Sequence, residues 1–245
     1  MLVKTIHKQY DGSCTFVSEN STLQFSFEMV DNTIQKRKLL SHPFFQLYSC
    51  GGLSQNIIQI FSLQFYHIVN YLPRFISAIH SNTNDWKIRQ NLLDNIEDIE
   101  YGKENILELW FRFLESIGIE KESLRSIQMF PFTRIFLDTI NDFCRNRSFV
   151  EGLSCLYTLQ NQSSEFLEIK LNYLPKYYNI NDKKSLKFFP VFKKEFFIDK
   201  SIIVNNITSE NFSKVIFSAD KTAYSFWKFL DGIMEHYGKR SLKYQ

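Results

Sequence analysis

From Val30 onward, apolar residues recur every three or four positions, which is the spacing of one face of an α-helix. Glycines at 51–52, 102 and 118 interrupt this pattern. Ser54 can cap the helix that follows the first of these breaks, and Asn84 or Asp85 can cap the next helix. Pro73 is expected to kink its helix, because proline removes a backbone donor and clashes with the preceding turn. The predicted helices span 31–49, 54–80, 85–100, 104–117, 121–127, 132–146, 148–178, 183–200 and 208–238.

The first thirty residues follow a different pattern. The apolar run 15–17 and the alternation Leu23, Phe25, Phe27 flank a polar segment at 19–21, which predicts a β-hairpin. We find no internal repeat and no linker long enough to divide the remainder. The sequence therefore predicts an N-terminal β-hairpin extension over residues 1–30 and one all-α bundle over 31–245.

Composition narrows the class of protein. The chain has 44% hydrophobic residues and 25 Phe against only 8 Gly and 5 Pro, which favours long packed helices with short loops. Its 29 Lys+Arg and 26 Asp+Glu form no concentrated basic stripe, so we expect no nucleic-acid partner. Polar residues break the most apolar window, 57–79, so we expect no membrane-spanning helix. Lys4, His7 and Lys8 interrupt any apolar run near the start, so we expect no signal peptide. The four cysteines lack CxxC spacing. We expect a cytoplasmic protein without a membrane segment.

The segment from His42 to Trp110 carries the motifs HPF, LLDN and ELW, and the segment 222–233 reads TAYSFWKFLDGI. These resemble the heme-oxygenase-like family that contains TenA-type thiaminases, pyrroloquinoline-quinone synthase and non-heme dimetal oxygenases. Among these groups, the nearest resemblance is to the oxygenase group of the Chlamydia protein associating with death domains, which makes para-aminobenzoate. The resemblance covers about residues 31–240 and implies a heme-oxygenase-like bundle. It also implies a homodimer, or a heterodimer with a family paralogue.

In the oxygenase-type relatives, two metals are held by Glu-x6-His, a second Glu, and His-x3-Asp-x2-His. Here Ile99 and Ile106 fall at the first pair and Gln160 at the second Glu. The third element aligns with Phe192, Phe196 and Asp199, or, after a three-residue slip, with Glu195, Asp199 and Ile202. We therefore expect no metal cofactor. The alternative is a dinuclear Fe or Mn site with relocated oxygen ligands, drawn from Glu97, Glu100, Glu195 and Asp199, although solvated surface carboxylates are the simpler interpretation.

The other branches of the family also lose residues here. Cys155 matches the nucleophile of TenA-type thiaminases, but the segment 64–66 lacks their Asp, and Ala223 replaces their late Glu. A cysteine without a base partner is more often a buried apolar residue. Phe45 stands at the position of the tyrosine that para-aminobenzoate-forming relatives consume. Ile99 stands at the position of a histidine of pyrroloquinoline-quinone synthase.

A polar remainder is expected to line the family's cavity and bind a small aromatic or heterocyclic molecule. His42 and His80 are as readily structural, and His67 and Cys155 are the catalytic candidates. Arg74 can neutralise an anionic ligand or pair with Glu97 or Asp98. The predicted ligand-binding residues are His42, Tyr66, His67, Arg74, His80, Tyr157 and Gln160.

Three functions remain open. The first is a degenerate, metal-free family member that binds a small molecule or serves as a partner subunit in a biosynthetic pathway. The second is an active oxidoreductase of cofactor or para-aminobenzoate-type biosynthesis, cofactorless or with relocated metal ligands. The third is a TenA-type thiamin-pyrimidine hydrolase.

Overall fold

The computed structural model of this chain describes residues 7–8, 14–15 and 19–241. The described part is helical apart from one short strand pair, which confirms the all-α prediction. The α-helices are α1 (Glu19–Gln35), α2 (Pro43–Ser49), α3 (Gln55–Ser81), α4 (Trp86–Glu100), α5 (Ile106–Ser116), α6 (Pro131–Asn146), α7 (Phe149–Tyr178), α8 (Lys183–Leu186), α9 (Phe188–Glu195), α10 (Lys200–Asn206) and α11 (Phe212–Ser241). Two 3₁₀ segments cover Leu39–Ser41 and Lys121–Ser126.

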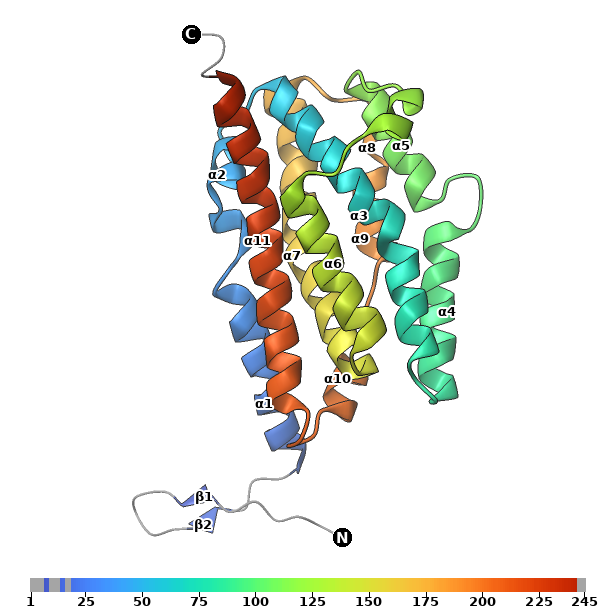
Figure 1. Cartoon of the computed structure of the whole chain (residues 1–245), viewed down its shortest axis with the longest axis vertical. Helices are drawn as coiled ribbons and strands as arrows, with labels where there is room; N and C mark the ends of the chain where they lie inside the picture. Colours follow the sequence, from blue (N-terminus) through green and yellow to red (C-terminus); the bar gives the residue numbers. More distant parts are fainter. Residues whose placement is uncertain (1–6, 9–13, 16–18, 242–245) are drawn as a thin grey trace.

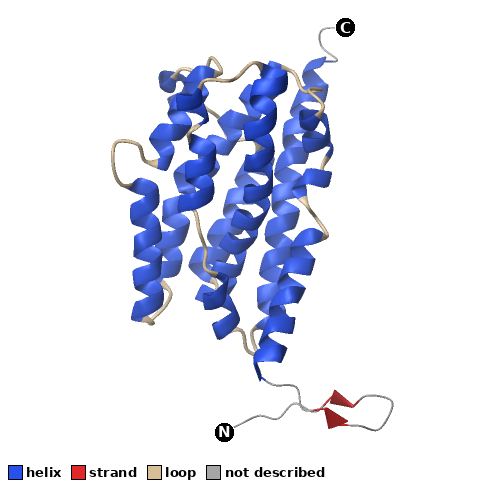
Figure 2. Cartoon of the chain, turned by 180° about the vertical axis from the view of Figure 1, so that it is seen from behind, coloured by secondary structure: helices blue, strands red, loops and turns tan. Residues whose placement is uncertain are grey.

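The long helices α3, α6, α7 and α11 form the centre of the bundle. Figure 1 shows α11, α6, α3 and α4 crossing the near face, with α7 behind them, and Figure 2 shows the bundle from behind. One continuous apolar core joins these helices. Within it, the buried Trp110 of α5 lies 5.3 Å from Phe65 of α3 and 4.5 Å from Phe188 of α9, measured between ring centroids. The aromatic-rich composition therefore fills the space between helices. No helix of the described residues is both long and apolar enough to cross a membrane.

Local sequence signals set both ends of α7. At its start, the Ser148 hydroxyl accepts a hydrogen bond from the Glu151 backbone N–H, and the Glu151 carboxylate accepts one from the Ser148 N–H. This capping box satisfies two donors that have no partner within the helix. At its end, Asn179 adopts a left-handed backbone with φ of 54°. The Ile180 N–H then donates to the Leu174 carbonyl, which closes the helix.

The predicted helix over 31–49 is wrong as one element. The structure ends α1 at Gln35 and begins α2 at Pro43. His42 has an extended backbone because the proline ring that follows it disfavours the helical conformation. The His42 side chain caps α2 by accepting a hydrogen bond from the Phe44 N–H.

The predicted N-terminal β-hairpin is not supported either. The polar turn at 19–21 and the second strand at 23–27 lie inside α1, and residues 16–18 lie outside the described part. His7–Lys8 does pair antiparallel with Cys14–Thr15, but over two residues each and in a different place. The alternation Leu23, Phe25, Phe27 matches the spacing of a strand, but so short a segment does not exclude a helix. Phe27 is instead the first described member of a buried helical series with Val30 and Ile34.

The chain beyond α7 is more broken than the predicted helix 183–200. It forms α8 and α9, and Asp199 caps the separate α10 by accepting a hydrogen bond from the Ser201 N–H.

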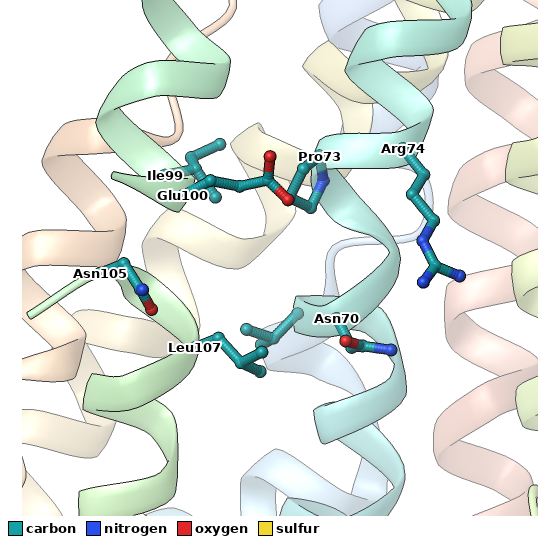
Figure 3. A pocket seen from close by; sticks show the side chains of 8 residues that line it. Asn70, Pro73, Arg74, Ile99, Glu100, Asn105 and Leu107 are labelled. Carbon is teal, nitrogen blue, oxygen red and sulfur yellow. The ribbon is translucent and has the colours of Figure 1, made fainter. Parts of the chain in front are cut away.

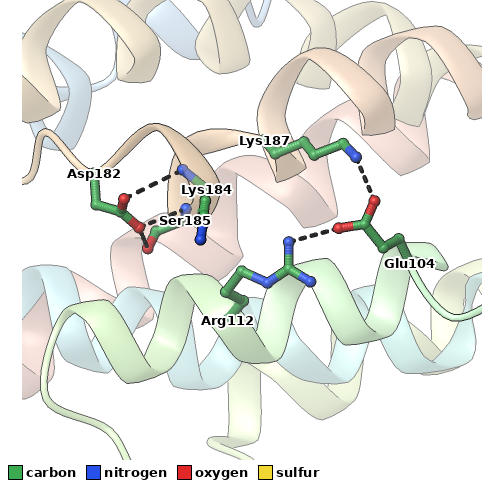
Figure 4. Close-up of polar contacts among 6 residues, drawn as sticks. All are labelled: Glu104, Arg112, Asp182, Lys184, Ser185 and Lys187. Atoms are coloured by element: carbon green, nitrogen blue, oxygen red, sulfur yellow. Dashed lines mark hydrogen bonds and ion pairs between the residues drawn. The ribbon is translucent and has the colours of Figure 1, made fainter.

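Glu104, just before α5, accepts hydrogen bonds from Lys187 and Arg112 (Figure 4). These two cations lower the pKa of Glu104 to about 2. The ion-pair cluster joins α5 to the α8–α9 segment at the surface.

Candidate functional site

Ile99 and Ile106, the two positions expected to align with the first metal-ligand pair of dimetal relatives, belong to the hydrophobic core. Ile99 lies in the last turn of α4 with 3% of its surface exposed, and Ile106, the first residue of α5, is fully buried. Neither isoleucine side chain carries a donor atom for a metal.

The second and third ligand positions are also used structurally. The Gln160 side-chain oxygen accepts a hydrogen bond of 2.6 Å from the Ile198 N–H, so it joins α7 to the segment before α10. Phe192 and Phe196 are buried, while Glu195 pairs with Lys194. The core-facing positions are therefore the phenylalanines of the ungapped alignment.

The available donor set does not fit a dinuclear metal centre. Among the described residues, no three or more His, Cys, Asp or Glu side chains lie close enough together to hold a metal ion. Glu97 and Glu100 are exposed on α4, and Asp199 is occupied as the cap of α10. The carboxylates proposed as relocated ligands thus remain apart.

Two of the predicted ligand-binding residues make structural contacts between helices. The His42 Nε2 lies 3.0 Å from the Asp231 carboxylate of α11, while its Nδ1 caps α2. Burial lowers the pKa of His42, although Asp231 opposes this shift. The Tyr157 hydroxyl donates a hydrogen bond of 2.8 Å to Asp31 of α1. Both side chains are fully used in holding α1, α2, α7 and α11 together.

His67 lies in a different environment. It is 7% exposed on α3, and its Nε2 has no hydrogen-bond partner among the residues that the structure describes. Burial lowers the pKa of His67, and the nearby Arg134 of α6 lowers it further. The adjacent Tyr66 points to another hollow, lined also by Phe111 and Lys121. The ring centroids of Tyr66 and His67 lie 5.4 Å apart.

Arg74 lines a groove between α3, α4 and α5. The groove has a volume of about 350 Å³ and is bounded by Val69, Asn70, Pro73, Arg74, Ile99, Glu100, Asn105 and Leu107. In Figure 3, Ile99 and Glu100 face Pro73, and Arg74 extends along α3 toward the turn that carries Asn70. The Arg74 guanidinium lies 5.0 Å from the Tyr71 ring. Within the described residues it forms no ion pair with Glu97 or Asp98, so it is available to an anion.

The remaining candidates lie elsewhere. His80, in the last turn of α3, accepts a long contact of 3.5 Å from Arg89. Cys155 of α7 is fully buried beside Cys144 of α6. Burial raises the pKa of the Cys144 thiol, and the hydrogen bond with Cys155 raises it further. This pair has the surroundings of packed apolar thiols. The predicted polar residues are therefore distributed over the bundle and do not converge on one cavity.

The most unusual polar group in the described core is Lys170 of α7, which the sequence analysis did not single out. It is 2% exposed, and its Nζ lies 3.6 Å from the Phe61 ring centroid. The rings of Phe65, Phe166 and Phe189 complete an aromatic cage at 5.5–6.0 Å. No hydrogen bond or ion pair to Nζ is present among the described residues. The cage also borders Trp110, whose buried indole N–H has no partner in the described part of the chain.

Desolvation determines the charge of Lys170. Removing an ammonium from water costs several kcal/mol, whereas a cation–π contact returns about 2 kcal/mol even when desolvated. Burial therefore lowers the pKa of Lys170 well below its usual value of 10.5. The lowered pKa makes the neutral, nucleophilic form of this amine easier to reach than in a solvent-exposed lysine. The sequence signal was present: Lys170 continues the buried series Ser163, Phe166, Leu167 and precedes Leu174 at helical spacing.

Comparisons with known proteins agree with this architecture. The chain is 31% identical over 224 residues to a 4-aminobenzoate synthase from Nitrosomonas europaea, covering 86% of this chain and 91% of that protein. It is 27% identical over 120 residues to a pyrroloquinoline-quinone synthase from Bradyrhizobium, covering 48% and 46% of the two chains. A domain from Shewanella denitrificans with a heme-oxygenase-like fold superposes with a TM-score of 0.68 at 14% identity, covering 91% of this chain and 95% of that one. The heme-oxygenase-like fold is thereby confirmed.

The family match extends over nearly the whole helical part. Residues 32–236 match the TENA/THI-4/PQQC family, close to the span of 31–240 expected from the motifs. The chain therefore belongs to the TENA/THI-4/PQQC family.

Proposed function

We propose that this protein is a metal-free member of its family that binds a small aromatic or heterocyclic molecule in a biosynthetic pathway. It acts as a binding protein or as a partner subunit, in a homodimer or with a family paralogue. The observation that carries the proposal is the burial of Ile99 and Ile106 in the core, at the positions where the family resemblance places metal ligands. The names of the relatives, 4-aminobenzoate synthase and pyrroloquinoline-quinone synthase, support a biosynthetic role.

The groove beside Ile99 supports a ligand that carries a carboxylate. Its volume of about 350 Å³ suits a single-ring molecule. The Arg74 guanidinium can bind a carboxylate through two parallel hydrogen bonds. Glu100, also at the groove, can accept hydrogen bonds from an amino group at the other end. An amino-substituted aromatic acid therefore matches the groove in size and polarity.

Calorimetric titration tests this assignment. We expect 4-aminobenzoate to bind, and 4-aminobenzamide, which lacks the carboxylate charge, to bind about tenfold or more weakly. Arg74→Gln should remove this preference, because a charge-assisted hydrogen bond is worth about 1.5–3 kcal/mol. Arg89→Gln, at an exposed site outside the groove, is the matched control. Equal binding of both compounds by the wild-type protein would refute the role of Arg74.

Elemental analysis tests the metal-free part of the proposal. Protein purified from cells supplied with iron and manganese should contain only substoichiometric metal. A content near two metal ions per chain would refute the proposal. Glu97, Glu100, Gln160, Glu195 and Asp199 would then be the side chains to substitute first.

A second candidate function, an active enzyme without a metal, is favoured by Lys170. A neutral amine in an apolar cage can attack a carbonyl carbon and, after loss of water, form a Schiff base. Incubation with benzaldehyde and cyanoborohydride at neutral pH should then modify Lys170 before the solvent-exposed lysines, as mapped by peptide mass spectrometry. Lys170→Met provides the control. Labelling of surface lysines alone would exclude this activity.

The TenA-type hydrolase has less support. Its nucleophile would be Cys155, which is fully buried beside Cys144, and the position of the late Glu is the fully buried Ala223. If Cys155→Ser retained any thiamin-pyrimidine hydrolysis, Cys155 would not be its nucleophile.

A further inference from the structure

Helix α4 lies at the outer edge of the bundle and turns one side to solvent (Figure 1). Its inner side packs on the core through Ile88 and Leu92. Its outer side carries large apolar side chains, since Trp86 is 66% exposed and Leu93 is 52% exposed. Tyr101, the residue that ends the helix, is 77% exposed. Exposed apolar side chains gathered in this way are typical of a surface that binds another macromolecule.

These exposed residues share one side of the helix. A helix turns once every 3.6 residues, so Trp86, Gln90, Leu93 and Glu97 form one stripe along α4. The buried residues of α4, at positions 88, 92, 95 and 99, lie on the opposite side. The stripe is therefore the surface of α4 that points away from the bundle, and we call it the outer face.

The second half of the outer face and its borders are acidic. Residues 94–100 contain no Lys or Arg, and their carboxylates are Asp94, Glu97, Asp98 and Glu100. Like charges three or four residues apart repel each other, and negative charge near the end of a helix opposes its dipole. In the described part of the chain no ion pair compensates them, because Lys194, which lies near Asp98, is paired with Glu195. A cation from outside the chain would relieve this repulsion.

The charge of the outer face limits what can cover it. Lys87 and Arg89 border its first turn, and two cations against four carboxylates leave a net charge of −2. Even an antiparallel pairing of two α4 helices would leave two carboxylates of each copy without a cation. Nucleic acids and anionic membranes are repelled for the same reason. The complementary occupant is a positively charged surface with apolar side chains.

We propose that the outer face of α4 binds a basic amphipathic helix of another protein. Apolar side chains of that helix pack against Trp86 and Leu93, and its Lys or Arg side chains pair with Asp94, Glu97 and Asp98. Glu100 borders the ligand groove and is not assigned to this contact. The occupant is thus a separate protein, distinct from a subunit that shares this fold.

Fluorescence titration of the full chain tests the proposal, because Trp86 is the most exposed of the three tryptophans. The probe is a synthetic helix of about 18 residues with Leu on one side, Lys on the other and no Trp, which is long enough to form a helix alone. We expect a blue shift of the emission as Trp86 leaves water. The same peptide with Glu in place of each Lys should bind about tenfold or more weakly.

Substitutions locate the contact. Asp94→Lys combined with Glu97→Lys should raise the dissociation constant of the basic peptide by about tenfold or more, because attraction becomes repulsion. Leu93→Ser should raise it by a similar factor without any change of charge, because an apolar contact is lost. Trp86→Phe should abolish the blue shift. The matched control is Glu115→Lys combined with Glu210→Lys, which changes the net charge equally at exposed sites outside α4 and should leave the dissociation constant unchanged.

Four outcomes would overturn the proposal. They are the absence of a blue shift, a shift that persists in Trp86→Phe, equal binding of the acidic peptide, and an equal effect of the control pair. A chain that dimerises in sedimentation velocity, and becomes monomeric on Leu93→Ser, would assign the face to a second copy instead. Leu93 does not line the ligand groove, so binding of 4-aminobenzoate by Leu93→Ser separates this result from failure of the proposed function.

Discussion

At the scale of single residues, Lys170 is the side chain whose surroundings least match its chemistry. A buried amine without a hydrogen-bond partner costs about 1–3 kcal/mol of stability. Met has a similar length and no polar group to desolvate. We therefore expect Lys170→Met to raise the free energy of unfolding by about 1–3 kcal/mol at neutral pH, measured by urea denaturation.

The pH dependence gives a second measure of the same side chain. The folded-state pKa of Lys170 lies below the unfolded value of 10.5, so below pH 10.5 the unfolded chain binds more protons. The wild-type free energy of unfolding should gain from this group as pH rises toward 10.5, and Lys170→Met should lack this gain. Equal slopes in the two proteins would mean that Lys170 is charged or solvated in the folded state.

His67 makes the stability sensitive to acid. Its folded-state pKa lies below the ordinary 6.5, because burial and then Arg134 disfavour the charged form. The unfolded chain thus takes up a proton first as pH falls below 6.5, and stability is lost in that range. Between about pH 7.5 and pH 5, His67→Phe should lose less free energy of unfolding than the wild-type chain. Thermal unfolding at several pH values measures the difference, and parallel curves would contradict the assignment.

At the scale of elements, caps and prolines explain both the successes and the errors of prediction. Helices were predicted to begin with a cap at Asn84 or Asp85 and at position 148, and the structure uses Asp85 and Ser148 as the N-caps. Those signals involve neighbouring residues only. The break before Pro43 was missed because apolar periodicity continued across it. The structural role considered for His42 is the one that the structure shows, since its side chain caps α2. The short alternation at 23–27 fits a strand or a helix, and packing of α1 on α11 determines which forms.

The packing of α6 against α11 gives a prediction at this scale. A Cβ atom added at Gly232 would lie 2.6 Å from a ring carbon of Phe132 and 2.9 Å from its Cβ. Gly232→Ala should therefore destabilise the protein by about 1–2 kcal/mol, since overpacking costs about 1–3 kcal/mol and better helix propensity returns up to about 1 kcal/mol. Chemical denaturation measures the change.

A rescue variant distinguishes overpacking from other causes. Adding Phe132→Leu to Gly232→Ala should recover part of the loss by removing the clashing ring. Ser213→Ala, at the exposed start of α11, should have little effect. If the double variant loses more free energy of unfolding than the two single variants lose together, the close approach of α6 and α11 is not the cause.

At the scale of the whole molecule, the packed apolar core leaves no place for the stability that a bound metal would add. A ligand that binds only the folded state at one hundred times its Kd adds about 2.7 kcal/mol to stability. The buried isoleucines and phenylalanines predict that iron(II) and manganese(II) leave the Tm unchanged. Differential scanning calorimetry with and without metal checks this. A saturable rise in Tm at two equivalents would contradict it.

The sequence by itself determined the class of fold, because helical periodicity, caps and the HPF, LLDN and ELW motifs are local signals. It also placed isoleucine, glutamine and phenylalanine at the expected ligand positions, since those depend only on residue identity. The tertiary structure alone decided which polar residues meet. His42 and Tyr157 found partners on other helices, and Gln160 found one in the segment before α10. Within the described part of the chain, the Lys170 amine found only aromatic rings. These outcomes depend on how helices distant in sequence are rotated and spaced, and one-dimensional periodicity carries no information about that.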